Sequence, residues 1–459
     1  MVVQHNMQAA NANRMLNVTT SAQSKSTEKL SSGYRINRAA DDAAGLTISE
    51  KMRKQIKGLD RASTNAEDGV SAVQTAEGAL TEVHSMLQRM NELATQSANG
   101  TNSNTDRQAI QDEIDQLTTE IDRVSETTKF NETYLLKGDG ADKAHNVNAH
   151  DAGIDGVTLT DKGDTVDVTL KELKAGDKIS IAGKNYTIGA EATDGQALVD
   201  GQADAGKTIT VNGTTYTYKN DKWTDADGND ATVGNGTAGT IKIGEGDVVS
   251  NGTKTLTVMK GVADGIDDND STVITAKKAY QLETAEILKA SNIGTDTAAA
   301  ADKNTGTLAD ATNKFTLTKG KVNYNDALSF NLHVGADADM TNKITVNIDS
   351  MNSAGLGIKG IKADTEQDAT YAIDAIADAI STVSSQRSAL GAVQNRLEHT
   401  INNLDNVVEN TTSAESRIRD TDMAEEMVNY SKNNILAQAG QSMLAQANQS
   451  NQGVLSLLQ

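Results

Sequence analysis

The sequence predicts a multidomain α+β protein. A long antiparallel helical bundle, or coiled coil, is built from both ends of the chain, and a β-rich surface region is inserted between them. Between residues 68 and 97, apolar side chains recur at alternating steps of three and four, the spacing of a helix that packs lengthwise on other helices. The segments 110–124 and 373–408 repeat this spacing. Between them Gly, Thr, Asp and Asn dominate, and no Arg occurs between Arg123 and Arg387.

Composition excludes several classes of function. A net charge of −21 argues against binding to nucleic acid or to an anionic membrane, both of which reward a basic surface. The 459 residues include no Cys, which excludes disulfides and thiolate metal sites. They also include no Pro, so the chain can unfold and refold without prolyl isomerisation. A compositional habit of the source organism would explain these absences equally well.

The start of the chain, MVVQHNMQAANANR, lacks the charged and apolar regions of a cleaved secretory signal. No window approaches the roughly 18 apolar residues of a membrane span. We therefore expect a soluble protein that leaves the cell, if it does, by a route without a cleaved signal.

The two terminal segments, 1–32 and 420–459, predict weakly amphipathic helices rich in Ala, Asn and Gln. Such helices bury too little apolar surface to offset their ordering entropy, so we expect them to be frayed in a monomer and ordered against partners. Their matching character predicts that they pair with each other. The candidate polymerisation residues are Val3, Met7, Leu16, Met427, Leu436, Met443, Val454 and Leu457.

The connection after the first helix has stop and start signals. Ser31-Ser32-Gly33 can end a helix because Gly33 can adopt a left-handed conformation. Asp41 and Asp42 can cap the next helix, predicted over 43–98 and ended by Asn99-Gly100. A short turn at 101–105 makes the following helix its antiparallel neighbour.

Three helical segments carry the seams of the predicted bundle. The third, 367–412, would span roughly 70 Å at 1.5 Å per residue and needs partners along its length. Arg387 interrupts it, which predicts local polar pairing there. The seam residues are Val70, Val73, Leu80, Val83, Leu87, Met90, Ile110, Ile114, Leu117, Ile121, Ile373, Ile376, Ile380, Leu390, Leu397 and Leu404.

The region 139–325 predicts one or two small β-rich domains on the surface. The segments 165–170, 178–188, 207–218 and 253–258 alternate like half-buried strands. Asn212-Gly213 between two such runs is a strong hairpin signal, and 276–290 is a lone helix. A further hairpin is predicted from 328–334 and 343–348.

Several motifs in order resemble those of bacterial flagellin, over both terminal thirds of the chain. They are MVVQHN at 1–6, LSSG at 30–33, RIN at 35–37, DDAAGL at 41–46, QRMNEL at 88–93, the hairpin region 328–358 and the end segment 437–459. One departure is the last residue, Gln459 in place of the Arg of many relatives, which leaves fine contacts at that terminus open.

The resemblance implies a structural subunit, not an enzyme, that polymerises into the extracellular flagellar filament. It implies export through the flagellar type III secretion channel without a cleaved signal peptide. Implied partners are other copies of the chain, an export chaperone at the C-terminal segment, and hook-associated junction and filament cap proteins. The implied domains are a terminal coiled-coil core (1–42 and 416–459), a long-helix bundle (43–138 and 326–415) and the insertion.

Flagellins are also ligands of the Toll-like flagellin receptor of animals, and the resemblance places the receptor patch at Gln88, Arg89, Leu93 and Glu113. Positions 89 and 93 are i, i+4 and share a helix face offset from the seam. An ordinary solvated ion pair between helices would account for Arg89 and Glu113 equally well.

Catalytic and metal motifs are absent from the sequence. It contains no His-Glu-x-x-His, Gly-x-Ser-x-Gly or Walker loop, and no cofactor is expected. His145 and His150 are a poor ligand pair, and the acidic runs 225–230 and 264–270 lack calcium-loop spacing. Two rival functions are a hook–filament junction protein with flagellin-like termini and an enzyme displayed on the filament.

Overall fold

The computed structural model describes residues 6–234, 236–261 and 263–456. These form two compact units. The first contains the chain up to Ser71, the segment Asn331–Val346 and the chain from Ala392 onward. The second contains Ala72–Phe330 and Asn347–Gly391. Among the described residues, no helix combines the length and apolar character that crossing a membrane requires.

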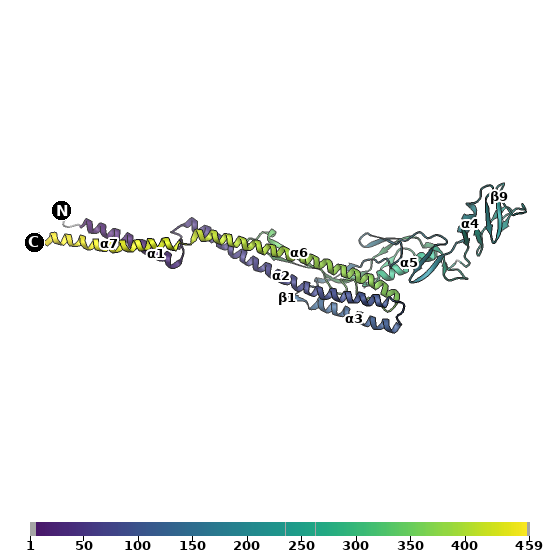
Figure 1. Ribbon diagram of the computed structural model, residues 1–459, viewed down its shortest axis with the longest axis horizontal. Helices are drawn as coiled ribbons and strands as arrows, with labels where there is room; N and C mark the ends of the chain where they lie inside the picture. The colour runs from purple at the N-terminus through teal and green to yellow at the C-terminus, as the bar shows by residue number, and fades with distance from the viewer. Residues whose placement is uncertain (1–5, 235, 262, 457–459) are drawn as a thin grey trace. The chain divides into compact units, whose positions relative to one another are not determined.

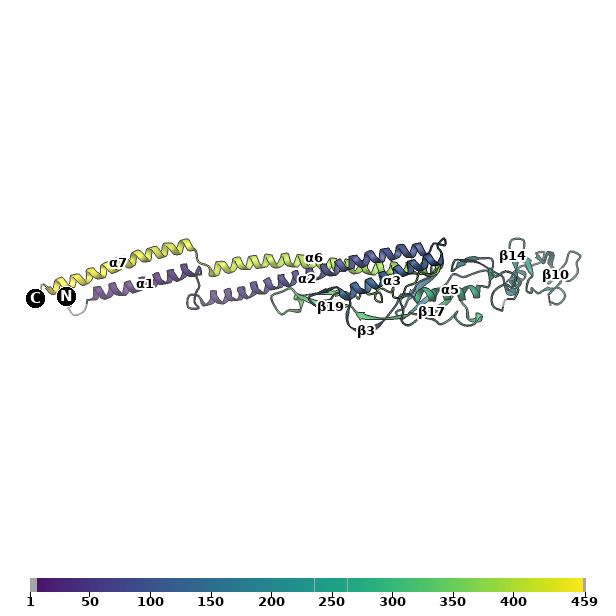
Figure 2. The ribbon, with the colours of Figure 1, turned by 90° about the horizontal axis from the view of Figure 1, so that it is seen from below.

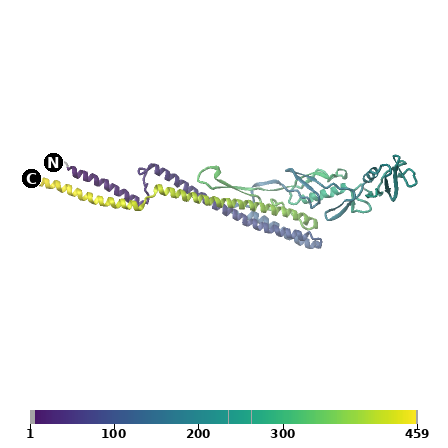
Figure 3. The same ribbon diagram turned by 45° about the horizontal axis from the view of Figure 1, so that its top comes forward.

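Two terminal helices pair in the first unit. Helices α1 (Met7–Ser32) and α7 (Met423–Ser456) lie side by side and antiparallel (Figures 1 and 3). Gly33 ends α1 with φ 76°, in the left-handed conformation that the sequence predicted. A Cβ at Gly440 would lie 3.3 Å from Leu16 Cδ1, so glycine allows close approach of the two helices. Each helix thus supplies, within one chain, a partner that the sequence predicted it would need.

One short connection joins α1 to α2 (Ala43–Ser97), and a second joins α6 (Glu366–Arg419) to α7. The Thr421 amide donates to the Gly33 carbonyl over 3.0 Å, and the guanidinium of Arg419 lies 4.6 Å from the ring centroid of Tyr34. The Asp42 carboxylate accepts from the Gly45 amide over 2.8 Å, which confirms the predicted cap of α2. Backbone and side-chain contacts therefore hold these two connections to each other.

Strands β19 (Leu328–His333) and β20 (Lys343–Ile348) form the predicted hairpin. In the first unit, its Ile344 forms a hydrophobic cluster with Ala66 on α2 and Leu397 on α6. A Cβ at Gly69 would lie 2.2 Å from Leu332 Cδ1, so the missing side chain leaves room for the hairpin. This explains a glycine within a long helix, where it otherwise costs about 1 kcal/mol.

In the second unit, the C-terminal part of α2, helix α3 (Asn104–Thr127) and the N-terminal part of α6 run alongside one another (Figure 2). Most seam positions of both units are buried: Val73, Leu80, Val83, Leu87, Met90, Ile110, Ile114, Ile121, Ile376, Leu390, Leu397 and Leu404. Val70, Leu117, Ile373 and Ile380 are half-buried. Arg387 Nη2 lies 3.8 Å from Glu77 Oε1, which is the polar pairing predicted at that interruption.

Two hydrophobic clusters lie entirely within the described part of the insertion. Asn212 (φ 50°) and Gly213 (φ 85°) form the turn of the predicted hairpin, and the predicted helix is α5 (Ala276–Ser291). The first cluster is built from α5 and two sheets. One sheet has β16 (Ala300–Ala301), β17 (Lys314–Thr318), β5 (Thr165–Thr169) and β4 (Thr158–Asp161), and the other has β15 (Val273–Ile274), β7 (Lys184–Ile188) and β6 (Lys178–Ile181). The 3₁₀ helix η1 (Leu308–Asp310) contacts α5.

The second cluster is built from α4 (Ala192–Asp200), the sheet β10 (Lys222–Thr224), β9 (Thr214–Lys219), β8 (Thr208–Val211), β13 (Val248–Ser250) and β14 (Thr255–Thr257), and the pair β11 (Thr232–Val233) and β12 (Thr240–Ile241). The remaining elements are β1 (Lys129–Phe130) with β2 (Thr133–Tyr134), β3 (Asp139–Asn146) with β18 (Lys321–Asp326), and η2 (Met340–Asn342).

Candidate functional site

The first candidate surface lies on α2 and α3 in the second unit. Arg89 Nε donates to Glu113 Oε1 over 2.9 Å, and Arg89 Nη1 donates to Glu92 Oε2 over 3.3 Å. The hydrogen bond to Glu113, and next that to Glu92, raise the pKa of Arg89 above its ordinary value. The guanidinium side chain remains 50% exposed, so a partner could contact it without unfolding either helix. We call Gln88, Arg89, Glu92 and Glu113 the α2–α3 surface.

Two further predicted patch residues differ in exposure. Gln88 is exposed, and its Nε2 atom lies 3.0 Å from Nε2 of His84. Leu93, expected on the same exposed edge, is instead buried at 2% exposure. It follows Met90 by three residues, so the helix places it toward the seam side. The prediction that Leu93 is a surface contact is therefore wrong. Leu93 is instead packed beneath the α2–α3 surface.

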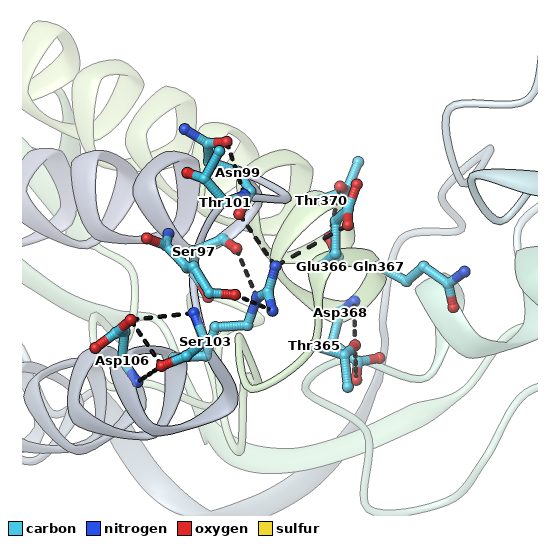
Figure 4. A network of polar contacts seen from close by, with 12 residues as sticks. Ser97, Asn99, Thr101, Ser103, Asp106, Thr365, Glu366, Gln367, Asp368 and Thr370 are labelled. Carbon is cyan, nitrogen blue, oxygen red and sulfur yellow. Dashed lines mark hydrogen bonds and ion pairs between the residues drawn. The ribbon is translucent and has the colours of Figure 1, made fainter.

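Arg107 is buried at the turn between α2 and α3 and makes a polar cluster there. Figure 4 shows this network, with Ser97, Asn99 and Glu366 labelled. Its guanidinium donates to three carbonyl oxygens: Nε to Ser97 over 3.0 Å, Nη1 to Asn102 over 2.9 Å and Nη2 to Asn99 over 3.0 Å. These carbonyls lie at or beyond the end of α2, where intrahelical partners run out.

Neither the apolar spacing nor the family motifs mark Arg107, which directly follows the Ser103–Asp106 capping box that begins α3. A long cationic side chain in that first turn is a signal for reaching back to the preceding helix end. Nη2 also lies 4.0 Å from Glu366 Oε2 at the start of α6. The cluster therefore connects three helix ends of the second unit.

The second candidate surface is the α1–α7 pair in the first unit. Large apolar side chains are unusually exposed there: Met7 75%, Met427 52%, Leu436 49% and Met443 60%, whereas Leu16 is half-buried between the helices. A groove of about 730 Å³ runs between them and is lined by Met15, Leu16, Leu436 and Met443 among others. Val3 and Leu457 lie outside the described residues, as does the side chain of Val454.

The candidate metal and calcium motifs have ordinary structural explanations. The His145 ring stacks on Tyr324 at 4.0 Å between centroids, and the His150 amide donates to Ser291 Oγ over 3.1 Å. Asp225 Oδ1 accepts from the amides of Asp227 and Asn229, so its carboxylate stabilises an acidic turn. Over the described ranges, no three His, Asp or Glu side chains are grouped as a metal site would need.

Comparisons with known proteins agree at both ends of the chain. Residues 3–141 match the family model described as the bacterial flagellin N-terminal helical region, and residues 373–458 match that of the bacterial flagellin C-terminal helical region. A flagellin of Clostridium tyrobutyricum is 42% identical over 98% of this chain and 100% of its own length. Flagellin of Bacillus subtilis is 36% identical over 100% of both chains, and flagellin D of Vibrio cholerae is 36% identical over 99% of both.

Proposed function

Because the chain belongs to the bacterial flagellin family, we propose that it polymerises with copies of itself into the extracellular filament of a bacterial flagellum. The observation that carries this proposal is the exposure of large apolar residues along α1 and α7. Apolar surface of this extent on a folded chain marks a protein–protein contact. Elongation of filament seeds by the purified chain tests the proposal.

Other partners in the proposed function follow from assembly. Export as an unfolded chain fits a sequence with no Cys and no Pro, because neither disulfide exchange nor prolyl isomerisation delays refolding. A chaperone that covers α7 before assembly would shield Met427, Leu436 and Met443. Hook-associated junction and cap proteins would contact the same terminal helices at the two ends of the filament.

The domains in this proposal are those expected from the sequence: 1–42 with 416–459, 43–138 with 326–415, and 139–325. The start of α2 at Ala43 supports the boundary after residue 42, whereas α6 continues through the expected boundary at 416 to Arg419. The alternative of a hook–filament junction protein is not favoured, since relatives aligned along almost the whole chain are named flagellins. The role is structural, and no catalytic function is proposed.

We also propose that the α2–α3 surface is a ligand patch for the Toll-like flagellin receptor of animals. Arg89 and Glu113 are half-exposed and fixed to each other, so their charges are presented in one geometry. Arginine in a preorganised contact is enriched among residues that dominate binding energy. Gln88 adds an exposed amide beside them, while Leu93 holds the helix face from below.

Replacing Arg89 tests the receptor proposal. Arg89→Ala should weaken binding of the monomer to the receptor ectodomain by about tenfold or more, as expected for an interfacial hot spot. The matched control is Arg123→Ala on α3, which removes an arginine that is 60% exposed, against 50% for Arg89, and is paired with Glu120. Surface plasmon resonance measures both affinities, and circular dichroism checks that the helix content is unchanged. Equal affinities of the two variants would rule the patch out.

Filament assembly offers a second readout of the same patch. If α2–α3 surfaces are covered by neighbouring subunits, monomer should bind the receptor ectodomain and intact filament should not. Co-sedimentation of ectodomain with filaments, against pull-down by monomer, measures this. Binding of equal strength by both forms would place the patch on the outside of the filament.

A further inference from the structure

An unpaired carboxylate is buried in the insertion. Glu283 on α5 is only 4% exposed, and its Oε2 atom has no hydrogen-bond partner among the described residues. The buried face of α5 also carries Ala279 and Ile287, which belong to the first hydrophobic cluster. An isolated carboxylate is expensive to bury while charged, so such a group is retained in its neutral form. Glu283 has no role in the filament assembly or the receptor binding proposed above.

A second carboxylate on the same helix provides a natural comparison. Glu286, three residues later, is 8% exposed, yet both of its oxygens are satisfied. Its Oε2 atom accepts from the Tyr371 hydroxyl over 2.7 Å, and its Oε1 atom lies 2.7 Å from Lys289 Nζ. Tyr371 is a buried residue of α6, so this bond ties the insertion to the helical bundle within the second unit.

Glu283 forms no ion pair with a cation in the described part of the chain, and of the lysines on its own helix Lys289 pairs with Glu286. On its own helix, Tyr280 accepts from the Leu173 amide, and its pKa is raised by burial and by the charges of Glu283, Glu172 and Asp177. Of the elements packed on α5, β6 carries Lys178, η1 carries Asp310 and β16 carries no charge. Lys178 forms no ion pair in the described part of the chain, and Asp310 accepts from Thr307. On α6, the Tyr371 hydroxyl donates its hydrogen bond to Glu286.

We propose that α5 is a pH-operated latch: Glu283 stays neutral while α5 is seated in the insertion, and its ionisation releases α5 together with the Glu286–Tyr371 bond to α6. Burial raises the pKa of Glu283 to about 7 from an ordinary value of 4.5. The seated state therefore binds the proton more tightly than the released state. Its stability is highest at low pH, falls as pH rises from 4.5 to 7, and stays low above 7.

Hydrogen exchange of the full monomeric chain measures the latch directly. Exchange rates of backbone amides in 276–291, corrected for the intrinsic effect of pH, report the opening of α5. Between pH 5 and pH 8 the opening constant should rise on the order of fiftyfold. Carbon-13 NMR of the labelled glutamate carboxyls in the wild-type chain gives an independent readout, with Glu283 titrating near neutrality.

Two variants separate the latch from general loosening. Glu283→Gln keeps shape but cannot ionise, so the pH dependence of exchange in α5 should disappear. Glu286→Gln removes the partnered carboxylate, so opening should increase at every pH while the pH dependence remains. Titration of Glu283 below pH 5, or the same pH dependence in the Glu283→Gln and wild-type chains, would overturn the proposal.

Discussion

Removing either terminal helix should abolish filament elongation while leaving the rest of the chain folded. Deletion of residues 1–32 or 420–459 takes away one member of the α1–α7 pair and exposes the other. The helices in 43–412 do not depend on that pair, because their seams are buried against one another and against the hairpin. Circular dichroism should therefore show the loss of only the terminal helical signal. Seeded elongation, followed by light scattering, should fall to background.

Point substitutions test the same surface without deleting a helix. The triple variant Met427→Gln, Leu436→Gln, Met443→Gln replaces side chains that are about half exposed, so α7 should still form. Each large apolar side chain contributes about 1.5–3 kcal/mol when fully buried, so three changes should raise the critical concentration for elongation by at least about a hundredfold. The matched control is Met340→Gln, which changes a 73% exposed methionine in η2, outside the terminal helices.

Two outcomes would contradict the terminal-helix model. Normal elongation of either deleted chain would show that the contacts lie elsewhere. Loss of elongation in the Met340→Gln control equal to that of the triple variant would show that the effect comes from general loss of apolar surface.

The sequence predicted the helices well because large apolar residues mark a seam at steps of three and four. Apart from Ala76, it missed the alanines that line the same seams, such as Ala94, Ala372 and Ala379, all buried at 0% exposure. Alanine is common on any helix face, so it carries no signal of burial until a neighbouring helix is in place. Close packing of long helices depends on these small residues as much as on the leucines.

The candidate surfaces were predictable only in part, because spacing on one helix does not say which face a second helix covers. Leu93 is four residues from exposed Arg89 and three from buried Met90, so either face was compatible with the spacing. The sequence predicted the helix that carries Glu283. Whether Glu283 Oε2 has a hydrogen-bond partner depends on the tertiary structure, so the sequence could not predict that it lacks one among the described residues. Hairpin and cap signals were reliable because they act within a few residues of chain.

Replacing Arg107 should destabilise the helical bundle strongly. Its side chain is 9% exposed and satisfies three carbonyl oxygens near the end of α2. Arg107→Ala removes these charge-assisted bonds and leaves a buried space, which should lower the free energy of unfolding by about 3 kcal/mol. Urea titration of the monomer, followed by circular dichroism at 222 nm, measures the loss.

Two further variants show whether the guanidinium fork or the charge is responsible. Arg107→Lys keeps the charge but cannot reach three diverging carbonyls at once, so it should recover less than half of the lost stability. Arg123→Ala, an exposed arginine on the same helix, should unfold at the same urea concentration as the wild type. If Arg107→Lys is as stable as the wild type, the positive charge at the helix end is sufficient. If Arg107→Ala is also as stable as the wild type, water replaces the hydrogen bonds of the guanidinium without cost. The apolar seam between the helices would then be sufficient to hold the α2–α3 turn.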